Sequence, residues 1–265
     1  MRNKLLRPLI VLLLAVFVNA CTASPNTVLD MRLAVEAPRF GDTDPVSWTG
    51  KTPNHYQVHG IDVSKYQGQI DWGKTRRGGI AFAFIKATEG GDHMDERFRQ
   101  NWHAAGQAGI PRGAYHFYYF CRTAREQARW FIRNVPRDPN SLPPVLDMEW
   151  NHGSKTCKHR PSPVKVRSEM RTFLRMVQQY YGKKPLIYTT VDFYSDNHLS
   201  LIRDHEFWLR SVADHPSKVY PGQNWSFWQY TGTGQIPGIK GETDINVFAG
   251  SPSTWRQWVV ARTGQ

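Results

Sequence analysis

Two acidic residues separated by one position, Asp147 and Glu149, form the strongest chemical pattern in this sequence. They follow the apolar residues Val145 and Leu146, which predict a strand. Alternate residues of a strand point to the same side and lie about 6.6 Å apart, so these two carboxylates repel each other. Repulsion and partial burial raise the pKa of one of them. A carboxyl that keeps its proton near neutral pH can act as a general acid, and glycoside hydrolysis uses two carboxyls in this way.

The elements that must position this pair are eight short apolar runs alternating with longer amphipathic stretches. The predicted strands are 58–63, 80–85, 113–119, 144–148, 185–189, 207–212, 226–229 and 243–248. The predicted helices lie near 95–108, 123–134 and 163–181. This alternation predicts an α/β barrel of the (β/α)8 kind, irregular in its second half because the last three strands leave little room for helices. A doubly wound open sheet is the alternative, but no glycine-rich phosphate loop follows the first strand.

In such a barrel, the active site lies at the carboxyl ends of the strands. Reading each run to its end adds further carboxylates and several aromatic rings to the acidic pair. The added carboxylates are Asp62, Glu89 and Asp244. The aromatic residues are Tyr115, Phe117, Tyr188, Trp208 and Trp228. The sequence therefore predicts an acidic cleft with aromatic walls, in which His116 is a hydrogen-bonded core or rim residue rather than a base.

The composition is that of a globular protein, with 265 residues of which 40% are hydrophobic and 21% charged. It excludes collagen-like, coiled-coil and wholly disordered chains. Ten Trp and an aromatic fraction of 13% hint at a flat apolar ligand such as a sugar ring, although large core side chains explain most of them. The net charge of +12 is dispersed and accompanies no nucleic-acid-binding motif. It favours an anionic extracellular polymer as partner over nucleic acid.

The N-terminus has the features of a bacterial secretory signal. Three basic residues precede an apolar stretch at 9–18 that is too short to span a bilayer comfortably. The sequence Val-Asn-Ala-Cys at 18–21 then resembles a lipobox. It predicts that Cys21 is lipidated and anchors the protein in the bacterial cell envelope, on the periplasmic or outer-membrane face. An ordinary signal peptide cleaved after Ala20 is the alternative.

The chain divides into three predicted segments. Residues 1–20 are the lipoprotein signal peptide. Residues 21–56 contain scattered prolines and no sustained hydrophobic period, which is typical of a flexible tether behind the lipidated N-terminus. Residues 57–265 form the catalytic domain.

The two remaining cysteines, Cys121 and Cys157, are predicted to form a disulfide, because a pair of thiols in an exported protein is most simply bonded. Each follows a predicted strand, and loops that leave neighbouring parallel strands can meet at disulfide distance. A zinc site built from these cysteines with His152 and His159 is the alternative, but the spacing matches no common zinc pattern.

Four segments together resemble glycoside hydrolase family 25, the Chalaropsis-type lysozymes or N-acetylmuramidases. They are HGIDVSKYQG at 59–68, FIKATEG at 84–90, GAYHFY at 113–118 and LDME at 146–149. The resemblance covers roughly residues 57–250. It implies an irregular TIM-like (β/α)5(β)3 barrel that hydrolyses the β-1,4 bond between N-acetylmuramic acid and N-acetylglucosamine in peptidoglycan. It implies no cofactor and no metal, and the protein is expected to be a monomer.

The resemblance also implies roles for individual residues. Glu149 would be the general acid/base, and Asp147 would orient the substrate's 2-acetamido group for attack on the anomeric carbon. Asp62 and Asp244 would set the electrostatics of the same cleft. The residues lining the sugar subsites would be Tyr115, Tyr188, Trp208 and Trp228. Two residues depart from the family pattern: His93, and Arg210 in the strand where a small residue and an aromatic more often follow the Trp.

Two other functions remain open from the sequence. One is a lipid-anchored peptidoglycan-binding protein without turnover, against which the intact set of mutually repelling carboxylates argues. The other is hydrolysis of a different N-acetylated polysaccharide such as chitin, because a carboxylate pair with acetamido participation also serves there.

Overall fold

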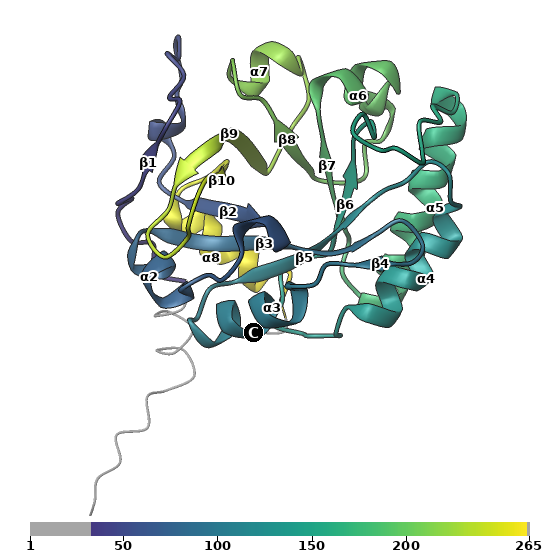
Figure 1. Cartoon of the computed structure of the whole chain (residues 1–265). Coiled ribbons are helices and arrows are strands. Elements are labelled where there is room, and N and C mark those ends of the chain that lie inside the picture. Colours follow the sequence, from purple (N-terminus) through teal and green to yellow (C-terminus); the bar gives the residue numbers. More distant parts are fainter. Residues whose placement is uncertain (1–32, 264–265) are drawn as a thin grey trace, which may run out of the picture.

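The computed structural model describes residues 33–263, and its centre is a closed barrel of eight strands (Figure 1). Around the barrel the order is β2-β3-β5-β6-β7-β8-β9-β10, and β10 closes the ring by pairing with β2. The strands are β2 (His59–Val63), β3 (Ile80–Glu89), β5 (Arg112–Phe117), β6 (Val145–Met148), β7 (Leu186–Thr189), β8 (Phe207–Arg210), β9 (Phe227–Gln235) and β10 (Thr243–Phe248). Each of the eight apolar runs is a strand, and the predicted irregular α/β barrel is confirmed.

One strand runs against the others. The pairings from β2 to β9 by way of β8 are parallel, whereas β10 is antiparallel to both β9 and β2. Asp244 lies near the start of β10. In an all-parallel barrel it would therefore lie at the rim where the strands begin, away from the carboxylates at the rim where they end. The reversal instead pairs Asp244 with Asp62 at the end of β2. The direction of β10 therefore decides whether these two carboxylates share a rim.

The three predicted helices are present as α3 (Phe98–Gln107), α4 (Ala124–Asn134) and α5 (Pro163–Tyr181). Local sequence sets their ends: Thr123 and Glu126 form a capping box at α4, and Gly182 in the left-handed conformation ends α5. In Figure 1, α4 and α5 lie side by side outside the barrel. The elements that the hydrophobic pattern did not reveal are β1 (Gly41–Asp42), β4 (His93–Met94), α2 (Trp72–Arg77), α6 (Val191–Asp196), α7 (Pro216–Val219), α8 (Pro252–Val260) and the 3-10 turns η1 (Pro53–His55), η2 (Lys65–Gln67) and η3 (Leu199–Leu201).

Aromatic side chains fill the barrel core. Phe82 and Phe227 lie with their ring centroids 5.0 Å apart, and Trp255 from α8 packs 5.3 Å from the Phe82 ring. Trp208 stacks 4.7 Å from Phe84 in the same cluster. Burial of such large rings is a main stabilising contribution in a core of this kind. Most tryptophans are buried here, so large core side chains account for the aromatic composition better than sugar-binding does.

The segment predicted as a flexible tether is attached to the barrel at several points within residues 33–56. β1 pairs with β9, and the side chains of Leu33 and Tyr56 are buried. Trp48 contacts Trp228 edge to face, with 5.1 Å between the ring centroids. The tether prediction is therefore wrong for residues 33–56. The anchoring residues are few and irregularly spaced, so they give no hydrophobic period. Residues 21–32, with the lipobox cysteine, lie outside the described residues.

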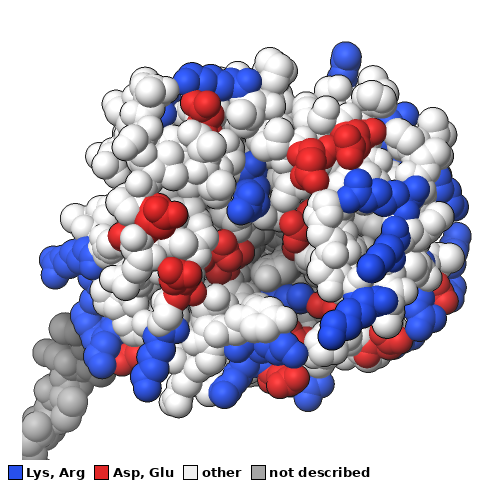
Figure 2. All heavy atoms as spheres, turned by 45° about the horizontal axis from the view of Figure 1, so that its top comes forward, with Lys and Arg blue, Asp and Glu red and all other residues white. Residues whose placement is uncertain are grey.

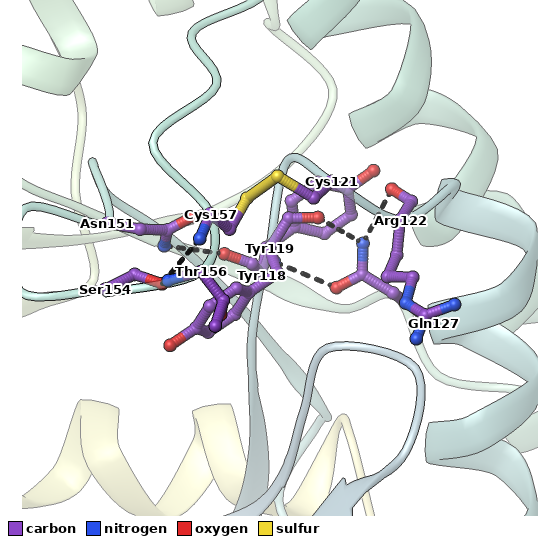
Figure 3. The surroundings of a disulfide bond; sticks show 9 residues. All are labelled: Tyr118, Tyr119, Cys121, Arg122, Gln127, Asn151, Ser154, Thr156 and Cys157. Atoms are coloured by element: carbon purple, nitrogen blue, oxygen red, sulfur yellow. Dashed lines mark hydrogen bonds between the residues drawn. A yellow bond between two sulfur atoms is a disulfide. The ribbon is translucent and has the colours of Figure 1, made fainter.

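The predicted disulfide between Cys121 and Cys157 is confirmed, with 5.8 Å between the two Cα atoms (Figure 3). It joins the loop after β5 to the loop after β6. Next to it, Asn151 donates a hydrogen bond to the Tyr118 carbonyl at 3.0 Å, and the Cys157 amide donates to Ser154 Oγ at 2.9 Å. Because both sulfurs are in the bond, neither is available as a zinc ligand, and the alternative metal site is excluded.

We expect removal of the disulfide to lower stability without unfolding the barrel. The bond closes a loop with a sequence separation of 36 residues. For a loop of this length, chain entropy predicts a stabilisation of about 3–4 kcal/mol. The double variant Cys121→Ala, Cys157→Ala should keep the circular dichroism spectrum of the wild type and unfold at lower urea concentration. Labelling of both thiols in the native, unreduced protein would contradict the assignment of this bond.

Candidate active site

A cleft of about 290 Å³ lies at the rim where the parallel strands end. Figure 2 shows this face hollowed, with acidic and basic side chains on the walls of the hollow. Residues from β2, β3, β5, β6, β7, β8, β9 and β10 all contribute. The lining residues are Asp62, Val63, Ser64, Tyr66, Gln67, Lys86, Tyr115, Phe117, Asp147, Glu149, Tyr188, Trp208, Arg210, Gln229 and Asp244.

The four carboxyl groups of the predicted site lie together in this cleft. Asp62 is the last residue but one of β2, Asp147 lies in β6, Glu149 directly follows β6, and Asp244 is the second residue of β10. The side chains of Asp62 and Asp147 are nearly inaccessible to solvent, with 7% and 6% exposed. Burial of several carboxyls at one rim is costly unless they are hydrogen-bonded or hold protons.

Two amide side chains hold the buried carboxylate of Asp62. Gln229 Nε2 and Asn246 Nδ2 both donate to Asp62 Oδ2, at 2.9 and 2.8 Å. The Tyr188 hydroxyl in turn donates to Gln229 Oε1 at 2.9 Å, and the Trp208 indole donates to Asn246 Oδ1 at 2.7 Å. The amides can therefore not flip, because their oxygens are fixed by these two donors. Through these amides, the aromatic residues of the cleft wall also orient the carboxylate of Asp62.

Burial raises the pKa of all four carboxyls. The pKa values of Asp62 and Asp147 are raised well above the usual range, first by burial and then by the charges of Asp244 and Glu149 respectively. Burial also raises the pKa of Glu149 to about 6, although the charges of Arg210 and Lys86 oppose it. The pKa of Asp244 likewise rises to about 6 through burial, opposed by Arg210. The cleft therefore favours retention of protons, as an acid catalyst requires.

Of the predicted wall residues, Tyr115, Phe117, Tyr188 and Trp208 line the cleft, and two others do not. Trp228 is fully buried and donates its indole hydrogen bond to the Ser211 carbonyl, away from the cleft. Alternate residues of β9 face opposite sides, and the inward position belongs to its neighbour Gln229.

Glu89 does not line the cleft either. Its carboxylate forms an ion pair with Lys86, the cation that does, at 2.6 Å. Glu89 therefore holds a wall residue rather than facing the site. His116 is buried and hydrogen-bonded on both ring nitrogens, to Thr88 at 2.8 Å and Gln127 at 3.0 Å, as predicted.

The residues that the sequence did not assign to the site are polar or charged ones at strand ends. Lys86 and Tyr66 belong to motif segments, whereas Gln229 and Asn246 lie within the predicted strands at 226–229 and 243–248, and none of the four carries a signal of its own. Inward-facing polar residues within apolar strands are the pattern that could have identified the two amides. Among residues 33–263, no cluster of three or more His, Cys, Asp or Glu side chains is arranged to hold a metal ion.

Comparison with known proteins places this site in a family. The family model described as "Glycosyl hydrolases family 25" matches residues 61–239. Protein YegX of Escherichia coli K12 is 38% identical over 217 residues, covering 80% of this chain and 77% of that protein. Lysozyme M1 of Streptomyces globisporus is 36% identical over 202 residues, covering 73% of this chain and 68% of the lysozyme.

A solved structure supports the same assignment. The structure of a family 25 glycosyl hydrolase from Bacillus anthracis superposes with a TM-score of 0.69 at 34% identity, covering 81% of this chain and 99% of that one. The matched fold, the extent of the family match and the acidic cleft at the strand ends agree. The chain belongs to glycoside hydrolase family 25 and is a glycoside hydrolase.

Proposed function

We propose that this enzyme is a muramidase, which hydrolyses the β-1,4 bond between N-acetylmuramic acid and N-acetylglucosamine in peptidoglycan. Membership of a family that includes lysozymes supports peptidoglycan as the substrate. The observation that carries the proposal is Glu149, a half-buried carboxyl at the end of β6 whose pKa is raised to about 6. It lines a cleft that aromatic rings flank.

Glu149 is the general acid of the first step. Its raised pKa keeps the carboxyl protonated in mildly acidic solution, so it can donate a proton to the glycosidic oxygen as the C–O bond breaks. In the second step, its carboxylate takes a proton from the attacking water. The charges of Arg210 and Lys86 keep the pKa from rising further, which allows the same group to act as both acid and base.

Asp147 orients the substrate's own nucleophile. Its Oδ1 atom is buried and has no hydrogen-bond partner among the described residues. It can accept the N–H of the 2-acetamido group, whose carbonyl oxygen then attacks the anomeric carbon as the leaving sugar departs. Positive charge that develops on the acetamido group favours the ionised form of Asp147, and this carboxylate in turn stabilises that charge. Water opens this cyclic intermediate, so the configuration at the anomeric carbon is retained.

The site bears differently on the two other functions that the sequence left open. A binding module without turnover gains nothing from four buried carboxyls that repel one another. Chitin also carries acetamido groups and would fit the same acid and orienting carboxylate. Mass analysis of digestion products separates the two polymers, because a muramidase leaves N-acetylmuramic acid at the new reducing end.

We also propose that the enzyme acts in the bacterial cell envelope and is anchored by lipid at Cys21. The support is the lipobox, which lies outside the described residues. Within residues 33–263, no helix has the length and apolar character needed to cross a membrane.

Glu149→Gln should fold normally and lose most of its turnover. The amide has nearly the same shape but no proton acidic enough to transfer, and general acid catalysis contributes about 10²–10⁴-fold. The rate of release of new reducing ends from peptidoglycan measures the loss. Glu36→Gln, which alters an exposed glutamate of the N-terminal segment, is the matched control and should keep full activity. Clearing of cell-wall suspensions by Glu149→Gln at the wild-type rate would overturn the assignment.

The same substitution should stabilise the protein at neutral pH. The folded-state pKa of Glu149 is about 6 against an ordinary value of 4.5, so ionisation costs more in the folded protein. Stability is therefore lost as pH rises from about 4.5 through 6, by about 2 kcal/mol at most. Urea unfolding of Glu149→Gln should show a gain over wild type at about pH 7.5 that shrinks by about pH 4. Equal stability of the two proteins at both pH values would contradict the raised pKa.

Cys21 should carry a diacylglyceryl thioether in the mature protein. The wild type should then fractionate with membranes and partition into detergent. Cys21→Ala should be released as soluble protein or remain unprocessed. Its hydrolysis of purified peptidoglycan should proceed at the wild-type rate. Mass spectrometry of the N-terminal peptide decides the question, and unmodified Cys21 in a soluble wild-type protein would refute the anchor.

A further inference from the structure

Arg210 places a positive charge in the cleft that no protein group neutralises directly. It is the last residue of β8 and lines the same cleft as the four carboxyls. Among the described residues, its guanidinium forms no hydrogen bond and no ion pair. By contrast Lys86, the other cation of the cleft wall, is held by Glu89 at 2.6 Å. Arg210 is therefore the cation of this wall whose donors are open to a ligand.

The backbone that carries Arg210 is fixed. The Tyr220 hydroxyl donates to the Arg210 carbonyl at 2.6 Å, and the Ser211 amide donates to the Gln229 carbonyl at 3.0 Å. β8 itself pairs with strands on both sides. A guanidinium on a rigid strand end presents a planar fork of donors that matches a carboxylate. This is the arrangement of a built binding group rather than of a solvated surface arginine.

The position of Arg210 relates it to the reacting sugar. Its charge acts on both Glu149 and Asp244, so it lies within electrostatic reach of the acid and of the opposite wall. A sugar whose glycosidic oxygen meets Glu149 has its ring substituents in this part of the cleft. A substituent with a negative charge would be repelled by the carboxyls there, and Arg210 is the group that can compensate.

We propose that Arg210 binds the lactyl carboxylate of N-acetylmuramic acid, and that the enzyme prefers glycan strands whose stem peptides have been removed. The inference rests on the proposed muramidase function. Muramic acid differs from glucosamine by a lactyl ether that ends in a carboxyl group. Where a stem peptide is attached, that carboxyl is a neutral amide; where the peptide is gone, it is an anion. The reaction that supplies the preferred substrate is therefore hydrolysis of the lactyl amide bond.

A stem peptide also contains carboxylates, but they lie at least one amino acid further from the sugar ring. Arg210 lines the same cleft as Glu149 and lies at the end of a barrel strand, not on an outer loop. The lactyl carboxylate is thus the carboxylate that reaches it while the glycosidic bond is at Glu149. The experiment distinguishes the two sources.

The test compares three substrates: glycan strands freed of peptide by an amidase, strands that keep their peptides, and neutral chitin oligosaccharides. The full chain is assayed as wild type, Arg210→Ala, Arg210→Lys and the control Arg203→Ala, an exposed arginine outside the cleft. Each protein is measured at the plateau of its own pH profile, so that changes in carboxyl ionisation do not enter. We expect Arg210→Ala to lose about 10–100-fold in kcat/KM on peptide-free strands, mainly through KM, because one charge-assisted contact is removed.

On the other two substrates, the loss in Arg210→Ala should stay within about threefold, a value that matches the effect of a neutral contact. Arg210→Lys should be intermediate on peptide-free strands, since it keeps the charge but not the fork. An equal loss on all three substrates would overturn the proposal, because Arg210 would then act only through the catalytic carboxyls. A larger loss on peptide-bearing strands would overturn it in favour of a stem-peptide carboxylate.

A measurement of binding affinity tests the contact of Arg210 independently of the proposed muramidase activity. Titration calorimetry measures the affinity of inactive Glu149→Gln, with and without Arg210→Ala, for peptide-free strands. Weaker binding in the double variant supports the lactyl contact even if no muramic acid reducing end is ever released, an outcome that would overturn the muramidase proposal alone. Identical affinities of the two proteins would overturn the lactyl contact whatever the activity.

Discussion

The crowding of four carboxyl groups at one rim is the constraint on which the rest of this structure depends. Asp62, the pair Asp147 and Glu149, and Asp244 come from three different parts of the chain, and burial disfavours ionisation of each carboxyl where it lies. Left to relax, such groups would move apart or into water. The closed barrel prevents this, because each is fixed to a strand whose neighbours are fixed in turn. The chemistry is thus obtained at a cost in stability that the aromatic core offsets.

Rigidity around the site comes from contacts that also shape it. Tyr188 and Trp208 hold the amides that hold Asp62, so the walls and the acidic floor form one hydrogen-bonded unit. The disulfide fixes the loop after β6, which begins at Glu149. The segment before β2 pairs with β9 through strand β1. Each of these contacts lowers the freedom of a segment that lines the cleft.

The sequence is sufficient for the strands and for the carboxylates, because short apolar runs that end in polar residues are a strong local pattern. It is insufficient for Trp228 and Gln229, since a shift of one residue reverses which side of β9 faces the cleft. The direction of β10 is also not a local property: a hairpin and a crossover connection leave the same apolar run. Residues 33–56 escape prediction because a few anchors, such as Leu33 and Tyr56, hold them without any period.

The charges of the molecule act at two different ranges. The net charge of +12 is dispersed along the sequence and attracts an anionic polymer from a distance, although salt screens this attraction beyond about 10 Å. In the cleft, those carboxyls that are ionised contribute negative charge, and their field is less screened there than at the surface. A polymer drawn in by the surface therefore meets repulsion at the point of cleavage. A neutral section of the glycan can bind at this point without a compensating charge, whereas an anionic section needs a cation nearby. Arg210 supplies that cation without forming an ion pair with the acid, which leaves Glu149 free to exchange its proton.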